Sequence, residues 1–185
     1  HERCPETNVR LDTSLKPVDF LSQQIDIGIR YGHGAWPELI AEKLMEEEVY
    51  PVCSPSLLNG NTSLNTPKNL LNETLIHDLS LEGFPDFPTW SNWLTKAGVE
   101  ATDSTHNIQI NNSAAVLQSA IDGNGIALAR SVMVEDDLSA GRLIRLFPEI
   151  TFNSPLAYYV VYRPEHAQIQ RMSIFKDWLF DELTD

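Results

Sequence analysis

Short apolar runs alternate with longer stretches of helical spacing along most of this chain of 185 residues. The run at residues 126–129 is typical of a strand, and the run at 156–162 is apolar enough to be buried on both faces of a sheet. Apolar residues recur with the helical period at residues 90–97, 116–121 and 169–179. Such alternation favours an α/β fold, and we expect its sheet to be mostly parallel.

Charge and cysteine content exclude several classes of protein. The chain contains 13 Lys and Arg residues and 26 Asp and Glu residues, and its formal net charge of −13 is spread along the sequence. Because nucleic-acid affinity depends on Lys and Arg displacing counterions, we expect this polypeptide alone to bind neither DNA nor RNA. No signal peptide opens the chain, and no apolar run of membrane-spanning length occurs. Two cysteines without C-x-x-C spacing indicate idle thiols in a reducing cytoplasm rather than a zinc site.

Sequence motifs of the common enzyme classes are absent. The chain has no nucleophile elbow, no phosphate-binding loop and no H-E-x-x-H pair, and its five histidines show no metal-ligand spacing. The glycines of residues 122–125 follow a helical stretch and precede a strand, so they end a helix rather than bind a dinucleotide. We expect no catalytic residue, metal or cofactor. Ser54, His77 and Asp78 leave a hydrolase open as an alternative.

Polar residues follow several of the expected strands. Open α/β sheets bind ligands beyond the carboxyl ends of their strands, and a helix N-terminus favours anionic ligand atoms. Each residue taken alone is explained as a turn or cap residue, but together they are typical of the rim of a small-molecule cleft. The candidate binding residues are Tyr31, Gly32, His33, Ser54, His77, Asn112 and Arg130.

Several short segments follow one another along the chain: IDIGIRYGHG at 25–34, YPVCSP at 50–55, WSNWL at 90–94, GNGIALAR at 123–130 and LSAGRL at 138–143. In this order they resemble the effector-binding domain of LysR-type transcriptional regulators. Within that family the chain looks most like the group of the glycine-cleavage activators and beta-lactamase regulators. The resemblance covers nearly the whole chain.

The resemblance implies a two-lobed fold like that of type 2 periplasmic binding proteins. Two hinge strands at residues 48–53 and 156–162 would cross between the lobes. The first lobe would consist of residues 1–51 with 156–185, and the second of residues 52–155. Relative to the family, the chain lacks the first strand and most of the first helix. Its first four residues resemble only the last turn of that helix.

The resemblance also implies a function that is not enzymatic. A small-molecule effector would bind in the cleft between the lobes, at the seven residues named above. One of Trp90 and Trp93 would pack in the core of its lobe, and for the other a place in the core is favoured over one that lines the cleft. DNA would be bound only by a winged helix-turn-helix domain, which this chain does not contain. We expect a cytoplasmic homo-oligomer, a dimer or tetramer in the full-length protein. A free-standing solute-binding protein of the same fold is the alternative.

Overall fold

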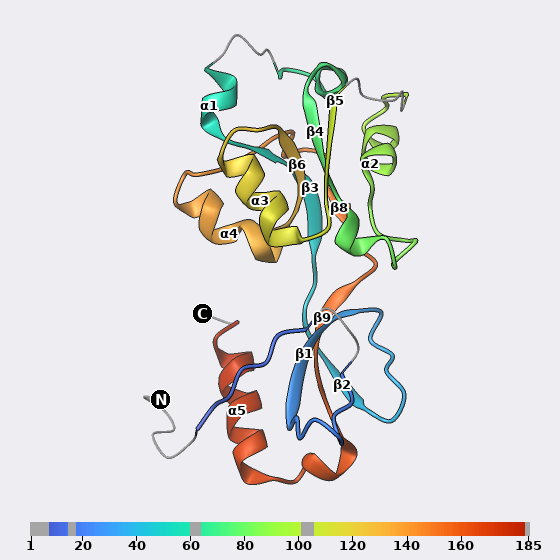
Figure 1. Ribbon diagram of the computed structural model, residues 1–185, viewed down its shortest axis with the longest axis vertical. Coiled ribbons are helices and arrows are strands. Elements are labelled where there is room, and N and C mark those ends of the chain that lie inside the picture. The colour runs from blue at the N-terminus through green and yellow to red at the C-terminus, as the bar shows by residue number, and fades with distance from the viewer. Residues whose placement is uncertain (1–7, 15–17, 60–63, 101–105, 184–185) are drawn as a thin grey trace. The chain divides into compact units, whose positions relative to one another are not determined.

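The computed structural model describes residues 8–14, 18–59, 64–100 and 106–183 (Figure 1). The segment expected to resemble the last turn of the family's first helix lies outside these residues. The chain divides into two compact units, one formed by His1–Met45 with Ala157–Asp185 and the other by Glu46–Leu156. No helix in the described part of the chain is both long and apolar enough to cross a membrane.

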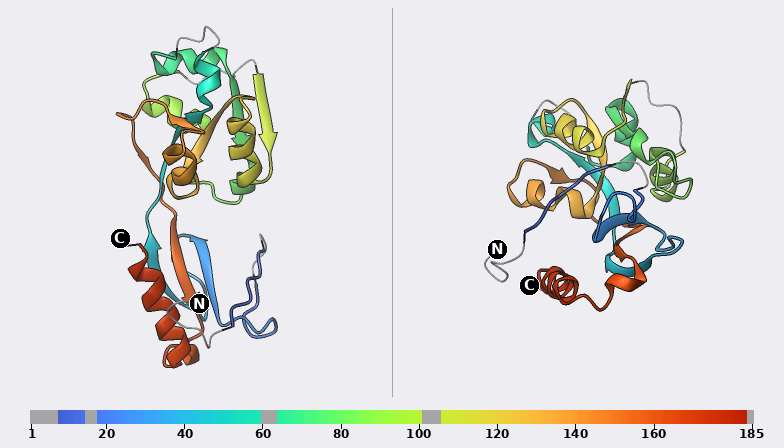
Figure 2. Two further views of the ribbon diagram at one scale, coloured as in Figure 1. Left: turned by 90° about the vertical axis from the view of Figure 1, so that its left-hand side faces the viewer. Right: turned by 60° about the horizontal axis from the view of Figure 1, so that its bottom comes forward.

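The first unit is a three-stranded antiparallel sheet with one long helix. β9 (Ala157–Tyr162) lies between β1 (Ile27–Gly32) and β2 (Ile40–Met45), which explains why its sequence is apolar almost throughout. The short helix η3 (Pro164–His166) leads into α5 (Gln170–Asp181), which runs along the sheet (Figure 2, left). The buried residues of this contact are Val160, Tyr162 and Met172.

The second unit contains a six-stranded sheet in the order β5-β4-β6-β3-β7, with β8 paired to β3. Its strands are β3 (Glu48–Cys53), β4 (Thr74–Asp78), β5 (His106–Ile110), β6 (Ile126–Arg130), β7 (Ile144–Arg145) and β8 (Phe152–Asn153). Its helices are α1 (Pro55–Leu58), η1 (Pro67–Asn72), η2 (Leu79–Leu81), α2 (Trp90–Lys96), α3 (Ser113–Ile121) and α4 (Ser131–Ser139). The mixed α/β class expected from the sequence is confirmed.

The expectation of a mostly parallel sheet is wrong. Among the described strands, the parallel pairs are β4 with β5 and β4 with β6. β3 pairs antiparallel with β6, β7 and β8, and the first unit's sheet is antiparallel throughout. Alternation of strands and helices predicts parallel pairing only where consecutive strands become neighbours. Here β3 and β9 each enter a sheet beside strands that are distant in the sequence.

Helices cover both faces of the second unit's sheet, with α3 and α4 on one face and α2 on the other (Figure 1). Ile76 of β4 packs in the core beneath α3, while its neighbour Leu75 packs with the residues of α2. This division follows from the pleat, because successive side chains of a strand point to opposite faces.

Both tryptophans of α2 belong to this core. Trp90 and Trp93 are both almost completely buried, which confirms the favoured core position and excludes the alternative that one of them lines a cleft. The indole Nε1–H of Trp90 donates a hydrogen bond to the carbonyl oxygen of Ile76 at 2.9 Å, which satisfies the polar group that burial would otherwise leave unpaired. Helical spacing placed the two rings on one stripe, and that stripe faces the sheet.

Candidate functional site

The carboxyl ends of three neighbouring strands lie side by side in the second unit's sheet, and we call this end of the sheet its carboxyl edge. β4, β5 and β6 run parallel, and their register pairs Asp78 with Ile110 and Ile76 with Ala127. Asp78 therefore lies at this edge together with Arg130, the last residue of β6. This is the part of an open α/β sheet at which ligands bind.

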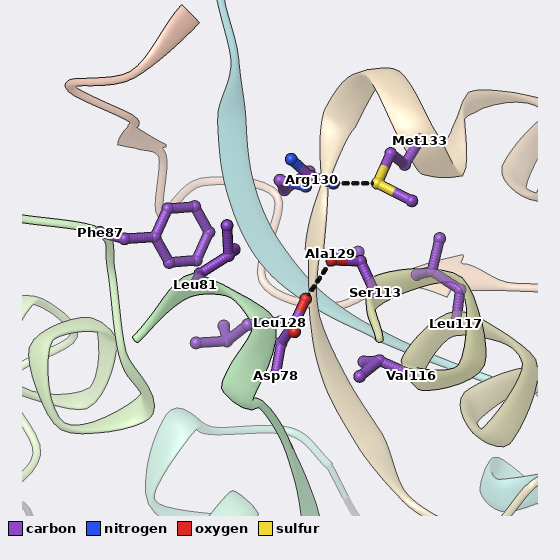
Figure 3. Close-up of a pocket in the computed structure, with 10 residues that line it drawn as sticks. All are labelled: Asp78, Leu81, Phe87, Ser113, Val116, Leu117, Leu128, Ala129, Arg130 and Met133. Atoms are coloured by element: carbon purple, nitrogen blue, oxygen red, sulfur yellow. Dashed lines mark hydrogen bonds between the residues drawn. The ribbon is translucent and has the colours of Figure 1, made fainter. Parts of the chain in front are cut away.

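A small pocket lies at this edge (Figure 3). Its free volume of about 10 Å³ has room for roughly one water molecule, so any larger ligand requires its side chains to move. A carboxylate and a guanidinium share the pocket with apolar side chains. The lining residues are Asp78, Leu81, Phe87, Ser113, Val116, Leu117, Leu128, Ala129, Arg130 and Met133.

Asp78 is the acceptor at the centre of a hydroxyl network. Its Oδ1 accepts hydrogen bonds from the backbone N–H of Ser80, at 2.9 Å, and from the Ser80 hydroxyl. Its Oδ2 accepts from the hydroxyl of Ser113, the first residue of α3 (Figure 3). The two hydroxyl oxygens are themselves 2.9 Å apart. The sequence indicates Asp78 only as a member of a possible triad, although its place at the end of a strand is the same signal that predicts the other candidate binding residues.

Arg130 joins β6 to α4 and lines the same pocket as Asp78. Its Nη2 contacts the sulfur of Met133, one turn into α4 (Figure 3). A guanidinium presents a planar set of donors that matches a carboxylate or phosphate group. The pocket therefore combines a cationic donor, which matches an acidic ligand group, with a carboxylate whose oxygens already accept hydrogen bonds from Ser80 and Ser113.

Asn112 lies close by in the chain, as the N-cap of α3. Its Oδ1 accepts a hydrogen bond from the backbone N–H of Ala115 at 3.0 Å. This contact satisfies one of the N–H groups that a helix N-terminus leaves unpaired. Asn112 therefore has a structural role, in addition to the binding role predicted for it.

His77 is directed away from this pocket. Because side chains alternate along β4, His77 lies on the face of Leu75, whereas Asp78 lies on the face of Ile76. The His77 ring nitrogen Nε2 is 2.9 Å from Oδ1 of Asn107 on the neighbouring strand β5. The structure does not bring His77 together with Arg130 in the pocket.

Ser54 lies at the opposite edge of the sheet. β3 runs antiparallel to β6, so the carboxyl end of β3 is level with the start of β6 rather than with Arg130. There Ser54 is the N-cap of α1, and its hydroxyl oxygen is 2.9 Å from that of Ser56. Ser54, His77 and Asp78 are therefore not arranged as a catalytic triad, whose members must lie within hydrogen-bond reach of one another. Among the described residues, no cluster of His, Cys, Asp and Glu could hold a metal ion.

Tyr31, Gly32 and His33 belong to the first unit, at the end of β1. The Tyr31 ring lies 4.9 Å from that of Tyr158 on β9, and a Cβ on Gly32 would approach the Trp36 ring to 2.9 Å. Gly32 is therefore required by the packing of Trp36, while the His33 side chain is exposed.

Comparison with known proteins agrees with this architecture. The family model of the LysR substrate binding domain matches residues 1–184. The glycine cleavage system transcriptional activator of Escherichia coli K12 is 35% identical over 175 residues, which cover 95% of this chain and 55% of that protein. The HTH-type transcriptional activator AmpR of Citrobacter koseri is 28% identical over 175 residues, covering 95% and 57% respectively. The chain thus spans just over half the length of these relatives.

Solved structures give the same result. The effector domain of the transcriptional regulator AmpR of Pseudomonas aeruginosa superposes with a TM-score of 0.78 at 27% identity, over 98% of this chain and 83% of that one. The AmpR effector binding domain from Citrobacter freundii gives a TM-score of 0.78 at 26% identity, over 99% and 86% respectively. The resemblance stated from short sequence segments is confirmed, and the chain belongs to the LysR substrate binding domain family.

Proposed function

We propose that this chain is the effector-sensing domain of a LysR-type transcriptional regulator. It binds a small molecule in a cleft between two lobes, and this binding changes how a separate DNA-binding domain acts on transcription. The observation that carries the proposal is the family match across residues 1–184, together with relatives that are named as transcriptional activators. A ligand acts in this way only when it binds one conformation more tightly than another.

The lobes of this proposal are residues 1–51 with 156–185 and residues 52–155, and they differ from the two compact units only in the assignment of residues 46–51 and 156. Tyr31, Gly32 and His33 contribute to the effector site from the first lobe, and Arg130 and Asn112 contribute from the second. Ser54 and His77 remain predicted contributors with weaker support than Arg130, because they lie away from the pocket that Arg130 lines.

The charge distribution supports a division of labour within the regulator. A net charge of −13 makes this domain repel the phosphate backbone, so the DNA contacts belong to a winged helix-turn-helix domain outside these residues. The proposed regulator acts in the cytoplasm. It acts there as a homo-oligomer, because helix-turn-helix proteins that bind two half-sites on DNA do so as symmetric dimers. This role requires a non-enzymatic domain, with its ligand released unchanged.

Arg130 provides the test of the effector site. The purified chain is titrated with amino acids and with short mono- and dicarboxylic acids by isothermal titration calorimetry. We expect Arg130→Ala to weaken the binding of an acidic ligand at least about tenfold, because a charge-assisted hydrogen bond contributes roughly 1.5–3 kcal/mol.

The matched control is Arg142→Ala. The exposed side chain of Arg142, just beyond α4, forms an ion pair with the partly buried Asp137, and ion pairs at the surface contribute little to stability. We expect this variant to bind the ligand normally and both variants to melt within a few degrees of the parent chain. Equal affinity of the two variants for the ligand would contradict the placement of the site at Arg130.

A further inference from the structure

Glu47 is a buried carboxylate beside the junction between the two units. Its residue is only 3% exposed, although glutamates are rarely buried without a partner. Met45 is the last residue of the first unit in this part of the chain, and β3 begins at Glu48. The burial of an acidic group at this position indicates that it has a specific contact within the second unit.

That contact is the start of α4. Glu47 Oε1 accepts hydrogen bonds from the Ser131 hydroxyl at 3.0 Å and from the backbone N–H of Val132 at 2.8 Å. The helix receives no side-chain cap from its own N-cap residue, Arg130. Glu47, more than 80 positions earlier in the chain, supplies the missing acceptor and places a negative charge at the positive end of the helix.

Glu47 and Ser131 also bind the two chain segments that lead to and from the first unit. The Ser131 hydroxyl accepts from the backbone N–H of Glu48 at 3.0 Å, and the carbonyl oxygen of Glu47 accepts from the backbone N–H of Ser154 at 2.8 Å. The next pair in register is Glu48 with Asn153. The outgoing strand, the returning strand and the first turn of α4 are thus joined by hydrogen bonds at one residue.

We propose that Glu47 is a positioning residue that couples Arg130 to the two chain crossings. This inference rests on the proposed function for its purpose, since it assumes that the effector acts at Arg130. Arg130 is bonded directly to Ser131, so a ligand that moves Arg130 displaces the groups that hold the Glu47 carboxylate. A buried carboxylate cannot exchange these donors for water without a large loss of free energy, so the strand that carries it follows them.

One further feature suits Glu47 to two arrangements of this cluster. Its Oε2 is buried and has no hydrogen-bond partner among the described residues. Buried polar atoms are nearly always paired, so an acceptor left over in one arrangement is available to a donor in another. A regulator that switches between two states needs such an element, whose equilibrium a ligand can bias.

Amide hydrogen exchange of the complete chain, followed by NMR, tests this coupling without any effector. In the parent chain, we expect Arg130→Ala to accelerate exchange at the crossing amides of Glu48 and Ser154 about tenfold. In a chain that already carries Glu47→Ala, the same substitution adds less than twofold, because the connection to the crossings is gone. Non-additivity of this kind reports energetic coupling between the two positions through the hydrogen-bonded groups that join them.

Two other variants keep the test decisive. If Glu47→Ala does not fold, Ser131→Ala replaces it, since it removes the hydroxyl that links the carboxylate to Glu48. Glu135→Gln is the control, an exposed acidic residue on the same helix, and leaves the effect of Arg130→Ala unchanged. Additive effects of Arg130→Ala and Glu47→Ala would overturn the coupling. A chain that binds no ligand but shows the non-additive exchange would contradict only the proposed function.

Discussion

Gly125→Ala provides a direct test of how closely the second unit's sheet is packed. Gly125 precedes β6, and a Cβ at this position would lie 2.5 Å from the carbonyl oxygen of Thr74 and 3.1 Å from its Cβ. Thr74 begins β4, whose next residue, Leu75, pairs with Ile126 of β6. The clash is therefore with backbone in the middle of a sheet, and it cannot be relieved by turning a side chain.

The magnitude follows from the severity of this contact. Inserting a carbon into a packed site typically destabilises a protein by 1–3 kcal/mol, and a contact this close to backbone atoms belongs at the upper end, about 3 kcal/mol. For a unit of this size, that loss lowers the melting temperature by roughly 12 °C. Urea unfolding followed by tryptophan fluorescence measures it, because Trp90 and Trp93 are buried in the same unit.

Gly83→Ala is the matched control, because a Cβ at Gly83 meets no atom within 4 Å and the backbone there has no left-handed strain. We expect the control to change the free energy of unfolding by no more than about 0.5 kcal/mol. If both variants unfold at the same urea concentration, the close approach of β4 and β6 at Gly125 is wrong.

Two further predictions concern burial. Burial raises the pKa of the Cys53 thiol from 9.0 to about 11, so in a Cys4→Ser chain an aromatic disulfide reagent at pH 8 should label Cys53 only as the protein unfolds. Rapid labelling of the native chain would contradict this burial. Because folded Cys53 keeps its proton to higher pH than unfolded Cys53, its contribution to the free energy of unfolding falls as pH rises from about 9 to about 11. Val116→Asp puts a charge at a 2% exposed position, and we expect it to lower the free energy of unfolding in urea by at least about 3 kcal/mol. Phe175→Asp changes a half-buried position, and we expect it to lower the free energy of unfolding by about 1 kcal/mol. Equal losses would contradict this difference in burial.

Local patterns predicted the elements of this protein well. The apolar run at 156–162 became β9, the buried central strand of its sheet, and Asn112 caps α3 as its position before a helical stretch indicates. Gly123 adopts a positive φ of 79° after α3, in agreement with the helix end predicted there. These features depend on residues within a few positions of one another, so the sequence displays them directly.

The candidate site was predicted less completely. The place of Arg130 after a strand predicts a binding residue, and Arg130 does line a pocket at the carboxyl edge of the sheet. The same pattern predicts Ser54, but β3 runs antiparallel to β6 and carries Ser54 to the other edge. The sequence predicts a binding role for His77 and not for its neighbour Asp78, yet the pleat directs only Asp78 toward Ser113 and the pocket.

The sequence alone predicted three features of this protein: its membership of the LysR substrate binding domain family, its mixed α/β class and the positions of its main strands. Strand direction, the edge on which each polar side chain lies and the contact of Glu47 with α4 were not predicted. These depend on which distant segments become neighbours. A strand's pattern of apolar residues records that one or both faces are buried, but it carries no information about the partner or its direction. Glu47 shows this most clearly, because an acidic residue in a run of three glutamates looks like a solvated surface until folding brings a helix N-terminus against it.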